Sequence, residues 1–196
     1  MRIIGGTHKG HRFTPPKNIP ARPTTDIAKE GLFNIINNNF YFDNLKALDL
    51  FGGTGSISYE LASRGCLDIT TIELDRRSVA FIQKTIKFMD FPINIIRLDV
   101  FKFIKKTKEK YNFIFAGPPY PLSNLDTIPD LIFEKGLVAP NGWLVLEHNP
   151  HHNFDKHPKF LRQRNYGTTI FTVFENTVAE SENTDEKEEA KNHNEA

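Results

Sequence analysis

Residues 47–55 read ALDLFGGTG, a short apolar run that passes directly into a glycine-rich turn. Apart from Asp49 the run is apolar on consecutive positions, as a strand buried on both faces must be. The glycines permit a tight turn and a close approach of the backbone to a ligand, and a helix after them would point N–H groups at an acceptor. The stretch therefore predicts a strand, a turn and a helix, although a bare match of this kind is as often purely structural.

The rest of the chain continues this alternation of strands and helices. Apolar runs of strand length alternate with helical periods, and two further strand-like stretches follow the last helix. We expect strands at 45–50, 68–73, 93–98, 111–116, 142–148, 160–166 and 168–175, and helices at 55–64, 76–89, 100–107 and 124–135. The expected fold class is α/β, an open Rossmann-like sheet with helices on both faces.

A different pattern precedes this alternation. Arg2–Gly5 and Gly10–Thr14 predict a short hairpin, and a proline-rich loop separates it from a helix capped by Thr24 or Thr25. The apolar face of that helix is expected to contain Ile27, Phe33, Ile36 and Phe40. We expect an N-terminal extension over 1–43, a main domain over 44–178, and a tail over 179–196 that is too poor in apolar residues to fold.

The charges are segregated along the chain. The tail holds seven acids and two lysines, which leaves 23 basic against 17 acidic residues in 1–178, a formal charge of +6. No acid precedes Asp26, while this N-terminal arm carries Arg2, Lys9, Arg12, Lys17 and Arg22. A basic arm on a basic body indicates a polyanionic partner, although most charged runs are merely solvated surface.

Composition also limits the compartment and the chemistry. The single cysteine, Cys66, excludes an internal disulfide framework, and the first residues lack an apolar signal segment, so we expect a soluble cytoplasmic protein with no membrane partner. Cys66 has no neighbouring base and is expected to be structural. The histidines of 148–157 lie in a loop-like segment without a helical metal motif, so no metal site is expected.

Chemically useful residues follow four successive predicted strands. In open α/β sheets the ligand lies beyond the carboxyl ends of the strands. The second strand ends at Glu73, 24 residues beyond Asp49, near the spacing at which a carboxylate accepts from ribose hydroxyls. The third is followed by Asp99, which could accept from an adenine amine or cap the next helix. The fourth is followed by Gly117-Pro118-Pro119-Tyr120. Taken together, these positions predict one ligand site at this edge of the sheet.

With these motifs the chain resembles a class I S-adenosylmethionine-dependent methyltransferase, and more narrowly the bacterial 16S ribosomal RNA guanine-N2 methyltransferase family known as RsmD. The resemblance covers residues 1 to about 176. It rests on RIIGG, RPTTD, KEGLFNI, DLFGGTG, IELDRR, GPPY, LEH and YG in the family's order. A nicotinamide enzyme is disfavoured because the glycine pattern is not G-x-G-x-x-G.

The resemblance implies a fold, a cofactor and site residues. It implies a seven-stranded sheet with the last strand antiparallel, a monomer, and ribosomal RNA or the assembling small subunit as the partner. S-adenosylmethionine would be bound by Asp49, Phe51, Gly52, Gly53, Gly55, Glu73, Asp99 and Thr25. The target amine would lie against Gly117, Pro118 and Tyr120, with Tyr120 stacking on the base, and RNA would contact Lys9, Arg12, Lys17 and Arg22.

Position 117 departs from the family, which usually has Asp where this chain has Gly117. Three explanations are open: a water accepts the proton, another side chain reaches in, or the chain binds cofactor and RNA with little turnover. We favour a slowed or water-assisted enzyme. The rival functions are a noncatalytic RNA-binding module that retains the fold and an adenine-N6 methyltransferase, which usually needs an added target-recognition region.

Overall fold

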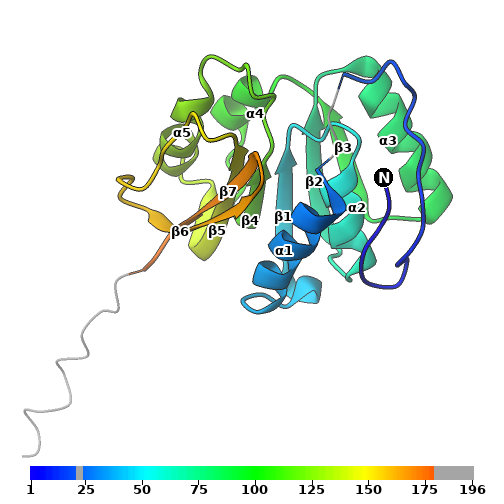
Figure 1. Cartoon of the computed structure of the whole chain (residues 1–196), viewed down its shortest axis with the longest axis horizontal. Helices are drawn as coiled ribbons and strands as arrows, with labels where there is room; N and C mark the ends of the chain where they lie inside the picture. The colour runs from blue at the N-terminus through cyan, green and yellow to red at the C-terminus, as the bar shows by residue number, and fades with distance from the viewer. Residues whose placement is uncertain (21–23, 179–196) are drawn as a thin grey trace, which may run out of the picture.

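The computed structural model describes residues 1–20 and 24–178 and forms a single seven-stranded mixed sheet with helices on both faces (Figure 1). The predicted fold class is confirmed. The strands are β1 (Lys46–Leu50), β2 (Asp68–Glu73), β3 (Ile93–Arg97), β4 (Tyr111–Ala116), β5 (Val138–His148), β6 (Phe160–Tyr166) and β7 (Thr169–Glu175). The helices are α1 (Asp26–Asn37), α2 (Ser56–Ser63), α3 (Arg76–Met89), α4 (Val100–Lys106) and α5 (Ile128–Glu134), with short 3-10 turns η1 (Phe42–Asn44) and η2 (Leu125–Thr127).

The strand order is β3-β2-β1-β4-β5-β7-β6. The first five strands are parallel, and β7 pairs antiparallel with both β5 and β6. The last strand in sequence is therefore antiparallel, as expected. The order reverses between β1 and β4, and the crevice at such a switch point is where open α/β sheets bind ligands. The central strands β1 and β4 are buried along nearly their whole length, which explains their unbroken apolar runs.

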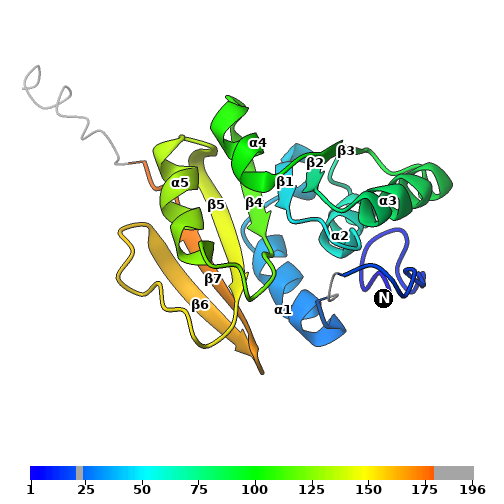
Figure 2. The same ribbon diagram turned by 90° about the horizontal axis from the view of Figure 1, so that it is seen from above.

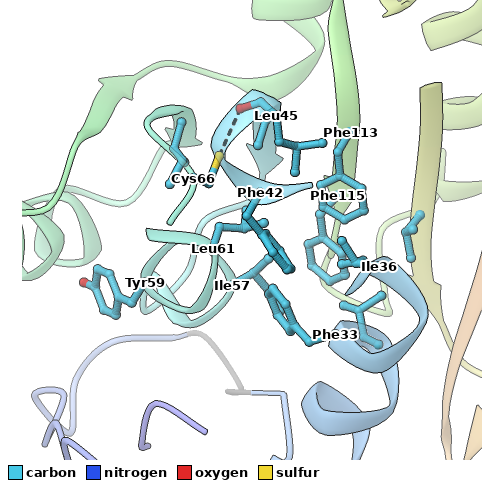
Figure 3. Packing of buried hydrophobic residues seen from close by; sticks show 14 of the residues in the cluster. Phe33, Ile36, Phe42, Leu45, Ile57, Tyr59, Leu61, Cys66, Phe113 and Phe115 are labelled. Atoms are coloured by element: carbon cyan, nitrogen blue, oxygen red, sulfur yellow. Dashed lines mark hydrogen bonds between the residues drawn. The ribbon is translucent and has the colours of Figure 1, made fainter. Parts of the chain in front are cut away.

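Two helical layers enclose the sheet. Helices α1, α2 and α3 cover one face, and α4 and α5 cover the other (Figure 2). Figure 3 shows Phe33 and Ile36 of α1 near Ile57 of α2 and Phe113 of β4, all within one buried cluster. The N-terminal extension therefore shares a core with the main domain.

A buried ion-pair network fixes the extension to α2. Lys29 is 1% exposed, donates to the carbonyl oxygen of Arg2 at 2.5 Å and lies 3.8 Å from the Glu60 carboxylate. Glu60 also accepts from the Ile4 amide at 2.9 Å and from Arg64 Nε at 2.9 Å. Burial lowers the pKa of Lys29, and the nearby Glu60 carboxylate opposes that shift. Arg2 of the N-terminal arm is also paired, since its Nε lies 2.7 Å from Asp26 Oδ2.

Two local expectations need correction, and a third is met in a minimal form. The predicted hairpin has a single antiparallel bridge, between Arg2 and Arg12, flanked by hydrogen bonds from the Ile3 amide to the carbonyl oxygen of His11 and from the Phe13 amide to that of Met1. Ile27 is 75% exposed, since the buried face of α1 runs through Ala28, Lys29, Leu32, Phe33 and Ile36, and Phe40 lies beyond the end of the helix. The fifth strand was expected to begin at residue 142, but β5 begins at Val138. Val138 pairs with Tyr111 of β4, and a bulge separates this pair from the pair Phe113 and Trp143.

Within the described ranges, no helix combines the length and the apolar character that crossing a membrane would require.

Candidate active site

A cavity of about 920 Å³ opens at the carboxyl ends of the central strands. Its walls come from the loops after β1, β2, β3 and β4, from the end of β5, and from the loop that leads into α1. The site residues expected to bind the cofactor line it, except Gly55, and so do Gly117, Pro118 and Tyr120. The structure thus brings these residues together although the sequence separates them widely.

The loop after β1 has an unusual backbone. Phe51 has a φ of 65°, which is uncommon for a residue with a side chain, and Gly55 has a φ of 81°. A Cβ at Gly55 would lie 2.4 Å from the Tyr59 ring, so this position requires glycine for both conformation and space. Gly55 precedes α2 without a capping side chain, which leaves the first N–H groups of the helix at the wall of the cavity.

Asp49 is buried at the bottom of this loop, with 2% of its surface exposed. Ser58 Oγ donates to its Oδ2 at 2.5 Å, and the same hydroxyl lies 2.7 Å from Thr71 Oγ1. Burial raises the pKa of Asp49 to about 7, although the hydrogen bond from Ser58 acts in the opposite direction. Because this pKa lies near neutral pH, a small change in the surroundings of Asp49 would change the charge of its carboxyl group.

Glu73, at the end of β2, is held by backbone donors. Its Oε2 accepts from the Gly53 amide at 2.7 Å, and its Oε1 accepts from the amides of Leu74 and Asp75 at 2.8 and 2.7 Å. This carboxylate joins the loops after β1 and β2 at the cavity wall. Its position suits an acceptor for ligand hydroxyls, because a carboxylate has about four acceptor sites and three are used here.

Asp99 caps α4 and also lines the cavity. Its Oδ1 accepts from the Lys102 amide at 2.9 Å. Of the two roles that the sequence left open, the helix cap is present, and the cap leaves the second oxygen, Oδ2, for a ligand. Thr25 similarly caps α1, accepting from the Ala28 amide at 3.3 Å, and lines the cavity.

The loop after β4 meets the end of β5. The Tyr120 hydroxyl donates to Glu147 Oε1 at 3.2 Å and lies 3.3 Å from Thr169 Oγ1, while Thr24 Oγ1 donates to Glu147 Oε2 at 3.1 Å. The Gly117 amide donates to the carbonyl oxygen of Leu50 at 3.2 Å. The loop that was expected to hold the target therefore lies at the β1/β4 switch point, with a carboxylate beside it.

Sequence reasoning did not assign a role to several residues of the cavity wall. Glu147, Thr24 and Thr169 form the hydrogen-bonded group just described. Ser56 and Ser78 have buried hydroxyls for which the described residues supply no hydrogen-bond partner. Both serines line the cavity, with their hydroxyl oxygens buried behind its wall.

The remaining predicted residues lie elsewhere. Lys9, Arg12 and Lys17 are exposed on the N-terminal arm and do not line the cavity, and Arg22 lies outside the described residues, as does the tail 179–196. His148 is buried, with Nε2 2.8 Å from Thr172 Oγ1, and burial lowers its pKa. Cys66 Sγ donates to the carbonyl oxygen of Leu45 at 3.1 Å, and burial raises its pKa to about 11 (Figure 3).

Comparison with known proteins gives the family. A family model described as Conserved hypothetical protein 95 matches residues 1–175. The chain is 32% identical over 148 residues to "Ribosomal RNA small subunit methyltransferase D" of Buchnera aphidicola subsp. Acyrthosiphon pisum (strain APS), covering 74% of this chain and 76% of that protein. The chain belongs to the RsmD family.

Solved structures share the fold. The hypothetical protein TTHA0928 of Thermus thermophilus superposes with a TM-score of 0.79 at 26% identity, covering 89% of this chain and 99% of that one. SMU.776, a structure complexed with SAH, shares the fold with a TM-score of 0.61 at 15% identity, covering 75% of this chain and 49% of that one. The chain is an S-adenosylmethionine-dependent methyltransferase. The cavity fits this cofactor, since it offers the Glu73 carboxylate, the second oxygen of Asp99 and the start of α2 to a polar ligand.

Proposed function

We propose that this protein methylates the exocyclic N2 amine of a guanine in small-subunit ribosomal RNA. The observation that carries the proposal is that the Gly117-Pro118-Pro119-Tyr120 loop opens into the same cavity as Glu73 and Asp99. A methyl donor bound at the β1 and β2 loops and an amine held at the β4 loop would share one space. The name of the Buchnera relative supplies the small-subunit RNA substrate.

The cofactor supplies an electrophilic sulfonium methyl group, and the protein's residues orient it. Glu73 would accept from the ribose hydroxyls, because an ionised carboxylate accepts and a hydroxyl donates. Asp99 would accept from the adenine amine through the oxygen that does not cap α4. The loop from Phe51 to Gly55 and the cap residue Thr25 would hold the methionine end, where the backbone N–H groups at the start of α2 suit a carboxylate.

The loop 117–120, called the target loop here, would orient the amine that is methylated. A guanine amine is a poor nucleophile because its lone pair is delocalised into the ring, so acceptors for its N–H groups and an in-line geometry must supply the catalysis. The carbonyl oxygen of Pro118, a buried residue, would accept from one N–H, with Gly117 beside it. The ring of Tyr120, whose hydroxyl is anchored on Glu147, would stack on a base extruded from its helix.

The N-terminal arm would position the RNA. Lys9, Arg12 and Lys17 are exposed cations on a segment whose end, at Pro20 and Thr24, reaches the cavity wall. Such cations bind phosphates without reading sequence, so the arm would supply affinity while the cavity selects the base. Arg22 belongs to the same proposal through its sequence position.

Labelled methyl transfer tests the proposal. The protein is incubated with labelled S-adenosylmethionine and small ribosomal subunits from a strain that lacks it, and the modified nucleoside is identified after digestion. We expect N2-methylguanosine at a single position. N6-methyladenosine would support the adenine-N6 alternative, and cofactor binding without transfer to naked RNA or subunits would support a noncatalytic RNA-binding module.

A further inference from the structure

Gly117 lies beside the Phe115 ring and an acidic side chain from another strand. A Cβ at position 117 would lie 2.9 Å from Phe115 Cε1, so this ring would have to shift slightly, and 3.9 Å from Glu147 Oε2. The residue is not among those with a positive φ, so its backbone conformation does not itself require glycine. A side chain at position 117 would therefore point toward the Phe115 ring and the Glu147 carboxylate.

Strand register explains this proximity. Ala116 of β4 pairs with Leu146 of β5, so the next residues, Gly117 and Glu147, lie side by side at the ends of two parallel strands. Corresponding residues of neighbouring parallel strands point to the same face of the sheet. The longer side chain of Glu147 can therefore bring its carboxylate close to where the carboxylate of an Asp at position 117 would lie.

The Glu147 carboxylate is held in place by groups from separate segments. Thr24, which precedes α1, donates to Oε2, and Tyr120, from the β4 loop, donates to Oε1. Thr169 at the start of β7 contacts the same Tyr120 hydroxyl. These contacts fix the carboxylate at the cavity wall, on the side of the target loop.

The other acids of the cavity wall lie away from the β4 loop. Asp49 accepts from Ser58, Glu73 accepts from three backbone amides, and Asp75 and Asp99 cap helices. These four lie within or after β1, β2 or β3, whereas Glu147 alone among the cavity-lining acids of the described ranges adjoins the β4 loop.

We propose that Glu147 is a catalytic residue that accepts the amine proton, in place of the acid missing at position 117; this inference rests on the proposed function. The amine nitrogen forms a bond to the methyl carbon as the carbon–sulfur bond breaks, and that electron pair stays on sulfur as a neutral thioether. The nitrogen then carries the positive charge and loses a proton to the Glu147 carboxylate, which releases it to solvent.

The first test is Glu147→Gln, with Glu134→Gln on the surface of α5 as the control for a lost negative charge. Single-turnover methylation of subunits from the strain lacking the protein should fall roughly ten- to a hundredfold, as expected for one charge-assisted hydrogen bond. Calorimetric affinity for S-adenosylmethionine should stay unchanged, and the control should match the parent. A rate for Glu147→Gln equal to the parent's overturns the inference, whereas no transfer by the parent contradicts the proposed function itself.

Rescue separates catalysis from a structural role. Gly117→Asp in the Glu147→Gln background should restore at least roughly a tenfold gain in rate, since the new carboxylate begins beside the lost one. In the parent background the same change should bring no gain, because two adjacent carboxylates would repel. Rates are compared at a temperature where circular dichroism shows every variant folded. A double variant that is folded and no faster than Glu147→Gln overturns the inference.

Discussion

The acidic side chains around the cavity differ in the groups that donate hydrogen bonds to their carboxylate oxygens. The carboxylate of Glu73 is held by amides of two loops, and that of Asp99 by the first turn of α4. Backbone donors are fixed by the fold, so these side chains support the shape of the loops as well as facing the ligand. A substitution that tests ligand binding must therefore separate the two roles.

Substitutions at Glu73 and Asp99 can make that separation. We expect Glu73→Gln and Asp99→Asn each to weaken S-adenosylmethionine binding about tenfold or more, because an amide nitrogen cannot accept from the ligand. Asn caps a helix as well as Asp, so Asp99→Asn should keep the stability of about 1 kcal/mol that Asp99→Ala loses, whereas Glu73→Gln also gives up an acceptor for a loop amide. Calorimetry and thermal melts of the three variants check this. Parent affinity in both Glu73→Gln and Asp99→Asn would remove these residues from the cofactor site.

Asp49 makes stability depend on pH. Its pKa is raised by burial from 3.8 to about 7, so between those values the folded chain keeps a proton that the unfolded chain releases. The free energy of unfolding of the parent should fall as pH rises through this interval, by something on the order of 4 kcal/mol. Asp49→Asn has no proton to lose, so its stability relative to the parent should increase with pH. Urea unfolding at several pH values measures the difference, and a difference that does not vary with pH would contradict the assignment.

The sequence was sufficient to place Asp49, Glu73 and Asp99, because each lies at or just beyond the carboxyl end of its own strand. It was insufficient for Glu147, whose position depends on the pairing of β4 with β5 across a gap of 30 residues. The available signal was the alignment of two parallel apolar strands, FIFA and LVL, each followed by a residue at the cavity. Without the register of these two strands, the sequence showed that position 117 lacks an acidic side chain and did not show that Glu147 lies beside it.

At the level of elements, the strongly patterned segments were the easiest to predict. The bounds expected for β2, α3, β4 and β6 are those observed. The apolar runs of β2 and β4 and the capping residue Asp75 before α3 made three of these elements clear in the sequence. The N-terminal segment was harder, because its contacts are with the faces of α2 and α3. Lys29 is the clearest example, since a lysine on a helix is normally exposed and only the distant Glu60 explains its burial.

The N-terminal arm should determine the salt dependence of RNA binding. We expect Lys9→Gln/Arg12→Gln/Lys17→Gln to reduce the slope of log affinity against log salt by about 2–3, because each phosphate contact contributes about 0.7–0.9. The charge-matched control is Lys105→Gln/Lys106→Gln/Lys108→Gln, exposed lysines at the end of α4 away from Asp99. Fluorescence anisotropy with a small-subunit RNA fragment measures both. Equal slopes for the two triple variants would show general electrostatic attraction and no specific role for the arm.

At the scale of the molecule, the extension and the main domain are joined in one core. Ile3 and four apolar residues of α1 belong to the same buried cluster as Phe113, Phe115 and Val145 of the sheet. The network of Lys29, Glu60 and Arg64 adds polar contacts across the same boundary. Thr24 extends this union to the cavity through its hydrogen bond with Glu147. We therefore propose that the division at residue 43 marks a change of sequence pattern and does not separate two units that unfold independently.

Calorimetry of one substitution in the extension tests this proposal for the whole molecule. Phe33 is fully buried on α1, and Phe33→Ala should cost about 3–5 kcal/mol, which lowers the melting temperature by roughly 6–20 °C for a chain of this size. Because the extension shares the core, the whole endotherm should move as one transition, and the Ile27→Ala control on the exposed face of the same helix should leave it in place. S-adenosylmethionine should raise the melting temperature of the parent and of both variants, since it binds only the folded chain. If Phe33→Ala instead splits the endotherm, with one part unmoved and still stabilised by cofactor, the extension would be a separate unit and its contacts with the cavity would not be needed to hold the site.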